Sequence, residues 1–538
     1  MRSAPRRRPR RIHLTPPAPS RSVAANAAIV AVAFVASRVL GLVREILIAR
    51  QFGTSGAYDA YVAAFRIPDL LFLVVMSGAF GSAFIPVFAG FLTRDEHDRA
   101  WRLASAVLTY TVMTLLVAGL LVFLFAGPLM RTVVAPGLAE REQHLAVNVT
   151  RMLLLSPLLL GLGAAAQGML QAQDAFTLPA LAPILYNLGI IVGAVTLAPS
   201  LGVYGLAIGV ILGATGHAGI QFAGLIRRGM RFTPTLSRHV HGLAEVARLM
   251  APRLVGQAAF QVNFIVMTNF ASRLGESKVS AINYAYQVFM LPHGVLALSL
   301  STVIFPMMAR QYELNRMSEL KATLRSALGP LLFLTFPAAV GLFAFRTSIV
   351  QTLFQVGSFS AESTRLVSQA LAYFAVGLVA FAVVEAVTRA FYAMHDTRTP
   401  VIAAVVTVAA NIALSWYLAP RLGHGGLALS ISITTMIEML ILLTVLYRRI
   451  GGLGWALLTS LGKTLVATAI MAVVAARFAG PLAELTAPSR GRSATSLAMF
   501  VITLGAVGIT YLVAAYYVRS PELFETLARI RSRLRRGR

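Results

Sequence analysis

The sequence predicts an all-α polytopic membrane protein of about 14 transmembrane helices, with two six-helix lobes in parallel repeat followed by two C-terminal helices. Composition, a series of long apolar segments and a weak internal repeat predict this fold. Of 538 residues, 57% are hydrophobic and only 12% are charged, about half the charged share of a soluble domain. So much apolar surface needs lipid as its solvent, which excludes an ordinary cytosolic enzyme and a disordered chain. The chain has no cysteine, so disulfides and thiolate metal sites are excluded as well.

Long apolar segments recur along the chain, separated by short polar loops. Each is long enough to cross a hydrocarbon layer of about 30 Å as a helix. Their continuous Ala- and Leu-rich composition differs from the alternating pattern of barrel strands. The expected segments are approximately 24–49, 58–91, 103–126, 147–170, 179–199, 203–225, 246–271, 280–309, 326–345, 366–391, 400–419, 425–447, 453–476 and 497–518.

The formal net charge of +27 is concentrated at the two ends and in alternate loops. More than half of the 47 lysines and arginines fall on the side of the two termini, which predicts that both termini are cytoplasmic. Basic tails beside a membrane predict attraction to anionic lipids. Nucleic-acid binding would need a folded basic face with stacking aromatics, and the tails contain only Phe524. No nucleic-acid partner is therefore expected.

The chain repeats itself weakly at an offset of about 221 residues. The offset covers six segments, an even number, so the halves have the same orientation and form the parallel repeat of a transporter. The matching motifs are Phe52-Gly53 with Leu274-Gly275, Pro86 with Pro306, Pro179 with Pro400, Leu201-Gly202 with Leu422-Gly423, and Arg227-Arg228 with Arg448-Arg449. We therefore expect a basic tail (1–23), an N-lobe (24–228), a C-lobe (229–449), two further helices (450–518) and a second basic tail (519–538).

Several ionisable residues lie inside the first two segments. Because such residues are costly in lipid, they normally face protein or water. The arginines outnumber the carboxylates at comparable depth, so a cavity between them would be cationic. It would suit an anionic substrate, above all phosphate, which arginine can hold bidentately. The residues are Arg38, Arg44 and Glu45 in the first segment and Asp59, Arg66 and Asp69 in the second.

Other charged groups have simpler interpretations. Glu385 and Arg389, four residues apart, can neutralise one another on one helix. The acidic stretch 95–98 alternates with arginines and is interpreted as a solvated loop, so no metal site is expected. No P-loop, GxSxG or HExxH motif occurs. The sequence thus predicts a transporter that is not an enzyme, has no cofactor and is driven by the membrane potential or a monovalent ion.

Three N-terminal motifs together resemble the MurJ/MviN family of lipid II flippases, members of the multidrug/oligosaccharidyl-lipid/polysaccharide superfamily. They read SRVLGLVREILIARQFG (37–53), YDAYVAAFRIPDLL (58–71) and GAFGSAFIPVF (78–88). Later stretches, VAPGL (134–138) and FYAMHDTRTP (391–400), are similar to the family's APGF and FY…DTKTP. The resemblance covers roughly residues 24–518.

The resemblance implies a V of two lobes with an inward cavity, and a groove formed by the last two helices for the lipid tail. It implies a bacterial inner-membrane protein that moves lipid II, the undecaprenyl-diphosphate-linked disaccharide-pentapeptide, to the outer leaflet by alternating access, beside the cell-wall synthesis machinery. Carried over motif by motif, the arginines of the first two segments become diphosphate contacts, and the acids take gate or ion-pair roles. The arginines are Arg38, Arg44 and Arg66, and the acids are Glu45, Asp59 and Asp69.

The sequence departs from the family pattern at two places. Phe72 and Leu73 replace a basic pair, and Ser77 replaces a glutamate. Gln287 stands where the family's YADR-type motif has arginine, and Arg253 is a candidate substitute.

Because of these departures, several alternative functions remain open. One is a flippase for another polyprenyl-linked glycan, and another is a cation-coupled exporter of the same superfamily. A membrane-embedded transferase and a non-transporting scaffold also remain.

Overall fold

The computed structural model describes residues 21–76, 79–487 and 494–536. Within these ranges the chain forms helices joined by short turns, with no strand, as the sequence predicts. The predicted tail 1–23 lies almost wholly outside the described residues, and so does Ser77.

The first half of the chain contains nine α-helices and two short π-helical turns among its described residues. In chain order these are α1 (Arg21–Phe52), α2 (Gly56–Met76), α3 (Ala79–Thr93), α4 (His97–Pro128), η1 (Leu129–Val134), α5 (Glu140–Leu153), α6 (Leu155–Gln171), α7 (Thr177–Val192), η2 (Gly193–Leu197), α8 (Ala198–Leu201) and α9 (Val203–Arg227).

The second half follows the same plan and then adds three helices. Its elements are α10 (Leu243–Ser272), α11 (Lys278–His293), η3 (Gly294–Leu298), α12 (Ser299–Glu313), α13 (Met317–Ala344), α14 (Arg346–Phe354), α15 (Ala361–Ala393), α16 (Arg398–Leu422), α17 (His424–Ile450), α18 (Trp455–Leu485), α19 (Ala494–Tyr517) and α20 (Pro521–Arg536).

Each predicted apolar segment lies on one helix or on consecutive helices. Eleven helical stretches of the described chain are long and apolar enough to cross a membrane. The other predicted segments correspond to α1, to α2 with α3, and to α10, which carry several ionisable residues each. The exact number of spans stays a prediction, whereas the all-helical, multi-pass architecture is confirmed.

The internal repeat reappears in the backbone. A non-glycine residue at positive φ is uncommon, yet such residues and glycines occur at matching places in the two halves. These turns repeat at the offset found in the sequence, so the two halves follow one backbone plan. The pairs are Gly53 (φ 54°) and Gly275 (100°), Asp95 (63°) and Asn315 (55°), Asp174 (56°) and His395 (59°), Gly202 (58°) and Gly423 (60°), and Gly229 (76°) and Gly451 (74°).

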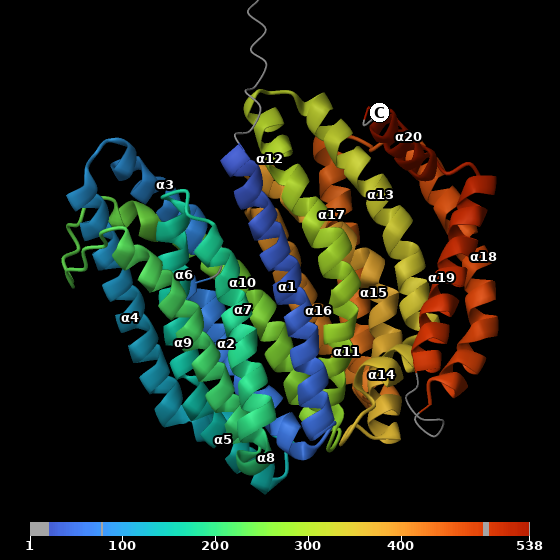
Figure 1. Cartoon of the computed structure of the whole chain (residues 1–538), viewed down its shortest axis with the longest axis horizontal. Helices are drawn as coiled ribbons and strands as arrows, with labels where there is room; N and C mark the ends of the chain where they lie inside the picture. The colour runs from blue at the N-terminus through green and yellow to red at the C-terminus, as the bar shows by residue number, and fades with distance from the viewer. Residues whose placement is uncertain (1–20, 77–78, 488–493, 537–538) are drawn as a thin grey trace, which may run out of the picture.

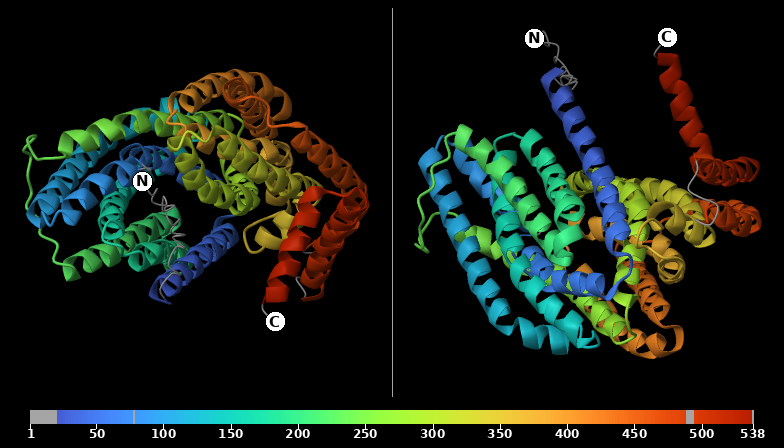
Figure 2. Two further views of the ribbon diagram at one scale, coloured as in Figure 1. Left: turned by 90° about the horizontal axis from the view of Figure 1, so that it is seen from above. Right: turned by 60° about the horizontal axis from the view of Figure 1, so that its bottom comes forward.

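Two groups of helices make up most of the molecule, with α1 between them (Figure 1). In the first group α9 packs against α6 and α7, and in the second α15 packs against α11, α13 and α17. Helices α18 and α19 pack together beside α13. Figure 2 shows the same arrangement from above and from below, with α20 extending from the bundle. The lobe boundaries of the sequence analysis stay a prediction.

The two groups meet at the end where α1 joins α2, which we call the closed end (residues 50–59, 133–140, 269–280 and 354–363). Here an aromatic cluster fills the interior. Tyr58 of α2 stacks on Tyr284 of α11 at 5.0 Å between ring centroids, and Tyr284 also contacts Phe354 and Phe359. Both tyrosines are at most 2% exposed. The apolar cluster therefore joins the two halves across this end.

Candidate functional site

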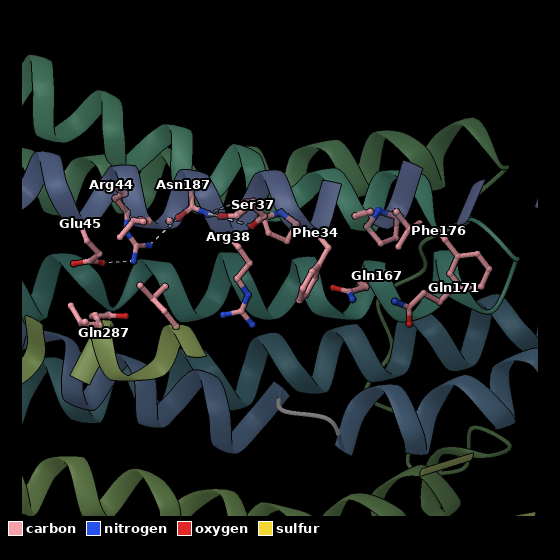
Figure 3. A pocket seen from close by; sticks show the side chains of 18 of the residues that line it. Phe34, Ser37, Arg38, Arg44, Glu45, Gln167, Gln171, Phe176, Asn187 and Gln287 are labelled. Carbon is pink, nitrogen blue, oxygen red and sulfur yellow. Dashed lines mark hydrogen bonds and ion pairs between the residues drawn. The ribbon is translucent and has the colours of Figure 1, made fainter. Parts of the chain in front are cut away.

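A cavity of about 550 Å³ lies beside α1, within the size range that accommodates a drug-sized ligand. Its wall is formed by α1, α6, α7, α11 and α14, so both halves of the chain contribute. Four of the predicted site residues line it: Arg38, Arg44, Glu45 and Gln287. Figure 3 shows these side chains around one space.

Arg38 is the exposed cation of this cavity. Its side chain extends away from α1 into the space (Figure 3), and its guanidinium carbon lies 5.3 Å from the ring centroid of Phe34. A Cβ built at Gly294 of η3 would stand 3.5 Å from an Arg38 nitrogen, so the guanidinium reaches the second half of the chain. Within the described residues Arg38 forms no ion pair. Its donors are therefore free to bind an anion.

Arg44 is held in place by two neighbours. One nitrogen donates to Glu45 at 2.5 Å, and another donates to Asn187 Oδ1 on α7 at 3.1 Å. Asn187 is only 7% exposed, and its amide nitrogen donates to the carbonyls of Ser37 and Pro183. The orientation of Arg44 is thus set by a buried amide that is itself fixed to two helices.

Glu45 neutralises part of the Arg44 charge without closing off the site. The carboxylate is 7% exposed, and only one of its oxygens meets Arg44. The other oxygen, Oε2, is buried and has no hydrogen-bond partner within the described residues. Because a buried unpaired carboxylate oxygen is costly, it marks a place where a donor on a ligand or a water would be stabilised.

Neutral polar groups complete the wall. Gln287 of α11 stands where an arginine was expected and lines the cavity as a half-buried amide. Gln167 and Gln171 of α6 lie further along the same cavity. Amides donate and accept hydrogen bonds without adding charge. The cavity therefore combines a cationic region on α1 with neutral polar side chains from α6 and α11.

Arg66, a predicted substrate contact, lies outside the wall of this cavity. It is 8% exposed, and its Nε donates to Thr268 Oγ1 of α10 at 2.8 Å. Its guanidinium carbon lies 5.5 Å from the centroid of the Phe264 ring. Asp69, one turn along α2, is half-buried and also lies outside the wall. In this conformation Arg66 joins α2 to α10.

Asp59, predicted as a gate or ion-pair residue, caps a helix of the other half. Its two oxygens accept hydrogen bonds from the backbone N–H groups of Ser277 (2.6 Å) and Ser280 (2.7 Å), at the start of α11. In the reverse direction, Glu276 accepts from the backbone N–H of Gly56 at the start of α2 at 2.8 Å. Carboxylates at helix N-termini are favourable. This reciprocal capping joins the halves at the closed end.

Two glycines bring backbone against backbone at the closed end. A Cβ at Gly137 would collide with the carbonyl oxygen of Ser272 at the end of α10, and a Cβ at Gly357 (φ +65°) with that of Arg50 near the end of α1. The Ser358 N–H donates to the Arg50 carbonyl at 2.9 Å. Each half thus places a glycine loop against the first helix of the other half, which only glycine permits.

A second, apolar hollow of about 490 Å³ lies among α13, α18 and α19. Its residues include Pro337, Phe345, Met471, Leu504 and Tyr511. The last two predicted membrane helices therefore do border a groove, as the resemblance implies. Its role in holding a lipid tail stays a prediction.

Two ion pairs of the second half lie away from the cavity and have structural roles. Glu385 and Arg389 of α15 form the predicted pair at 2.9 Å. Arg449 pairs with Asp396 at 2.6 Å on the loop before α16. Burial raises the pKa of Asp396, but hydrogen bonds from Thr399 and from the Arg398 N–H, together with Arg449, outweigh it and hold that pKa below its ordinary value.

Other predicted features are placed as follows. Arg253 lies in α10, but its side chain is outside the described residues. Phe72 packs beside the apolar cluster of α3, α4 and α6. Within the described ranges, no three His, Cys, Asp or Glu side chains gather where they could hold a metal ion.

The main residue that the sequence analysis missed is Asn187. It lies in an apolar stretch (TLPALAPILYNLGIIV) in which it is the sole amide. Such a residue in the middle of a membrane segment signals a hydrogen-bonded role. The sequence could therefore have marked Asn187 as a buried hydrogen-bonding residue, but not Arg44 as the group that it contacts.

Comparison with known proteins decides the family. A sequence model described as lipid II flippase MurJ matches residues 48–484. A lipid II flippase MurJ of Burkholderia cenocepacia is 35% identical over 421 residues, covering 77% of this chain and 81% of the relative. A probable lipid II flippase MurJ of Rhizobium tropici is 32% identical over 451 residues, covering 81% and 83%. The chain belongs to the lipid II flippase MurJ family.

Solved structures agree on the fold. A lipid II flippase MurJ in an inward closed conformation matches with a TM-score of 0.74 at 24% identity, covering 91% of this chain and 98% of that chain. An inward-facing multidrug transporter of the MATE family matches with a TM-score of 0.66 at 17% identity, covering 78% and 95%. The predicted resemblance to the MurJ family is thus confirmed, and the chain is a multi-pass membrane protein of a flippase family.

Proposed function

We propose that this chain moves lipid II, or a closely related polyprenyl-diphosphate glycan, from the cytoplasmic to the outer leaflet of a bacterial inner membrane. The observation that carries the proposal is the unpaired Arg38 beside the oriented Arg44 in a cavity shared by both halves. Two guanidinium groups suit a diphosphate, because each can donate two parallel hydrogen bonds.

The cavity provides different surroundings for different parts of such a substrate. The diphosphate would lie near Arg38 and Arg44, and the glutamines of α6 and α11 would face sugars or peptide. The apolar hollow beside α13, α18 and α19 is where a polyprenyl tail would stay in contact with lipid. Binding of this kind leaves the substrate chemically unchanged, and we propose no catalytic activity and no cofactor.

The closed end supports an alternating-access mechanism. In this conformation the aromatic cluster, the reciprocal caps and the glycine contacts join the halves on one side of the cavity. With both termini cytoplasmic, that side faces outward, so the cavity is accessible from the cytoplasm. Opening would require these contacts to separate while the halves meet at the other end. The energy would come from the membrane potential or a monovalent ion, worth about 2.3 kcal/mol per charge per 100 mV.

The test is genetic replacement. In a bacterium depleted of its own lipid II flippase, the wild-type protein should restore growth and cell shape. Arg38→Ala and Arg44→Ala should fail to do so at equal membrane abundance. Arg227→Gln, at the cytoplasmic end of α9, is the matched control and should behave as wild type.

Absence of rescue by a wild-type protein that reaches the membrane would contradict the lipid II assignment. A reconstituted assay with another polyprenyl-diphosphate glycan would then decide whether the same cavity serves a different lipid. Rescue by both arginine variants would contradict the role of the cavity.

A further inference from the structure

The last helix, α20, is strongly amphipathic, although the sequence analysis treated residues 519–538 only as a basic tail. It spans Pro521–Arg536 and contains five arginines and two glutamates. Counted at 100° per residue, its large apolar residues share one side and three of its arginines share the other. By this count the apolar side holds Leu523, Phe524, Leu527, Ile530 and Leu534, with Arg531 among them and Arg535 at its edge, and the opposite side holds Arg529, Arg533 and Arg536.

The start of α20 is firmly attached to the bundle. Glu522 is 8% exposed and accepts hydrogen bonds from the hydroxyls of Ser460 in α18 and Ser520. A Cβ at Gly329 of α13 would stand only 3.0 Å from the Glu522 carboxylate. Lys463 donates to the Arg519 carbonyl at 2.9 Å. The direction in which α20 leaves the bundle is therefore fixed by α13 and α18.

Beyond this attachment, two large apolar side chains of α20 are exposed among the described residues. Phe524 is 41% exposed and Leu527 is 36% exposed. Phe524 meets the ring of Tyr516 at 5.4 Å, and Tyr517 beside it is 79% exposed. The helix extends away from the bundle toward the C-terminus (Figure 2, right). Exposed aromatics at the end of a membrane helix are typical of the lipid headgroup layer.

The helix α13, which contacts the start of α20 at Gly329, carries two further cations. A Cβ at Gly451 would lie 3.5 Å from the Lys321 ammonium, and a Cβ at Gly454 would lie 3.6 Å from an Arg325 nitrogen, so both cations of α13 border the linker into α18. The carboxylate of Glu522 is already engaged by two serines. Exposed apolar side chains on a helix with five arginines are complementary to a membrane surface, where acyl chains lie beneath anionic headgroups.

We propose that α20 lies in the headgroup layer of the cytoplasmic leaflet and binds anionic phospholipids. Leu527 and its apolar neighbours face the acyl chains, while the arginines of the opposite side and flanks contact the headgroups. Each arginine near an anionic surface strengthens this attraction about five-fold. The proposal shares with the proposed function only the cytoplasmic placement of the C-terminus, and it does not depend on which glycan lipid is moved.

The experiment uses the absence of cysteine in the chain. Leu527→Cys and, on the opposite side, Ser532→Cys are each labelled with an environment-sensitive fluorophore in the full-length protein. Each is reconstituted in neutral phosphatidylcholine vesicles or in vesicles containing phosphatidylglycerol. The label at 527 should shift to the blue and resist the uncharged quencher acrylamide in the anionic vesicles, with less protection in the neutral ones. The label at 532 should stay accessible in both.

Charge removal supplies the second readout. Replacing Arg529, Arg533 and Arg536 by Gln in the Leu527→Cys protein should lower the ratio of protected to accessible label by about a hundred-fold. Replacing Arg227, Arg228 and Arg231 by Gln, at the end of α9, should leave it unchanged. Equal protection in neutral and anionic vesicles, or equal protection at 527 and 532, would overturn the proposal. These readouts measure no transport, so their failure is distinct from failure of lipid II complementation.

Discussion

The two halves of the molecule share one backbone plan but place their charges differently. In the first half, α1 carries Arg38, Arg44 and Glu45 against the cavity. In α10, one repeat later, the corresponding positions are all apolar. They are Ala259, Ile265 and Val266, at an offset of 221 residues. Among the described side chains, the cations that line the cavity therefore come from the first half.

Charges of the second half are instead paired within that half. Glu385 and Arg389 satisfy each other on α15, and Arg449 holds Asp396 beside α16. The second half offers the cavity a neutral amide, Gln287. The two halves of a repeated fold thus contribute different chemistry to the cavity: guanidinium groups from one half and a neutral amide from the other.

The largest effect should come from removing the free cation. Arg38→Ala should weaken binding of a lipid diphosphate by about ten- to a hundred-fold, because a charge-assisted hydrogen-bond pair is lost. The affinity of Arg38→Lys should lie between those of the wild type and Arg38→Ala, because lysine keeps the charge but lacks the planar, two-pronged guanidinium. Titration of purified protein with the lipid measures both. The control is Arg151→Ala, which removes a cation of α5 that lies beside Phe123. An equal loss of affinity in this variant would show that Arg38 has no specific role in binding the lipid.

A smaller loss is expected when Arg44 keeps its charge but loses its orientation. Asn187→Ala removes the acceptor at 3.1 Å and leaves the ion pair to Glu45. Affinity for the same lipid should fall about five- to ten-fold, less than the full ~1.5–3 kcal/mol of a hydrogen bond to a charged group, because the ion pair to Glu45 still holds Arg44 in part. Asn148→Ala, an exposed amide of α5, should have no effect. Unchanged binding by Asn187→Ala would show that α7 does not position the site.

Making the second half cationic tests the asymmetry directly. Gln287→Arg adds a guanidinium across from α1 and should tighten diphosphate binding about five-fold at low salt, with a steeper loss as salt rises. Binding at two ionic strengths measures this. Tighter binding that is indifferent to salt would contradict an electrostatic cause.

The smallest effect concerns the structural ion pair of the second half. The pKa of Asp396 is lower in the folded protein than in the unfolded chain. The ionised carboxylate therefore stabilises the fold at any pH above its pKa in the unfolded chain, about 4. This contribution is lost as the pH falls through the lower pKa of the folded protein. Asp396→Asn should cost about 1 kcal/mol near neutral pH. Thermal unfolding in detergent should show wild type and variant converging below about pH 4. If the unfolding temperatures of the wild type and the variant differed by the same amount at every pH, the charge of the Asp396 carboxylate could not be the cause of the difference.

The sequence was informative where chemistry is local. Ionisable groups in an apolar segment stand out, so Arg38, Arg44 and Glu45 could be found without a structure. The repeat was visible because turns need particular residues, such as Gly202 and its mate Gly423.

Other features depend on contacts between distant residues. Asp59 was recognised as a gate or ion-pair candidate, but not as the cap of a helix that begins some 220 residues later. The placement of Arg66 against Thr268 follows from how α2 crosses α10, which no spacing along the chain specifies. The amphipathic character of α20 was missed because its five arginines were counted as a basic tail, without the spacing of the five large apolar residues between them.

The glycine contacts of the closed end have a consequence for how such a protein can change. Gly137 and Gly357 meet backbone carbonyl oxygens of the opposite half, so this part of the closed end depends on close backbone approach. The polar wall of the cavity lies elsewhere, on α1 and α7. Mutations that reshape this wall therefore need not disturb the backbone contacts of the closed end, and the two regions can diverge independently.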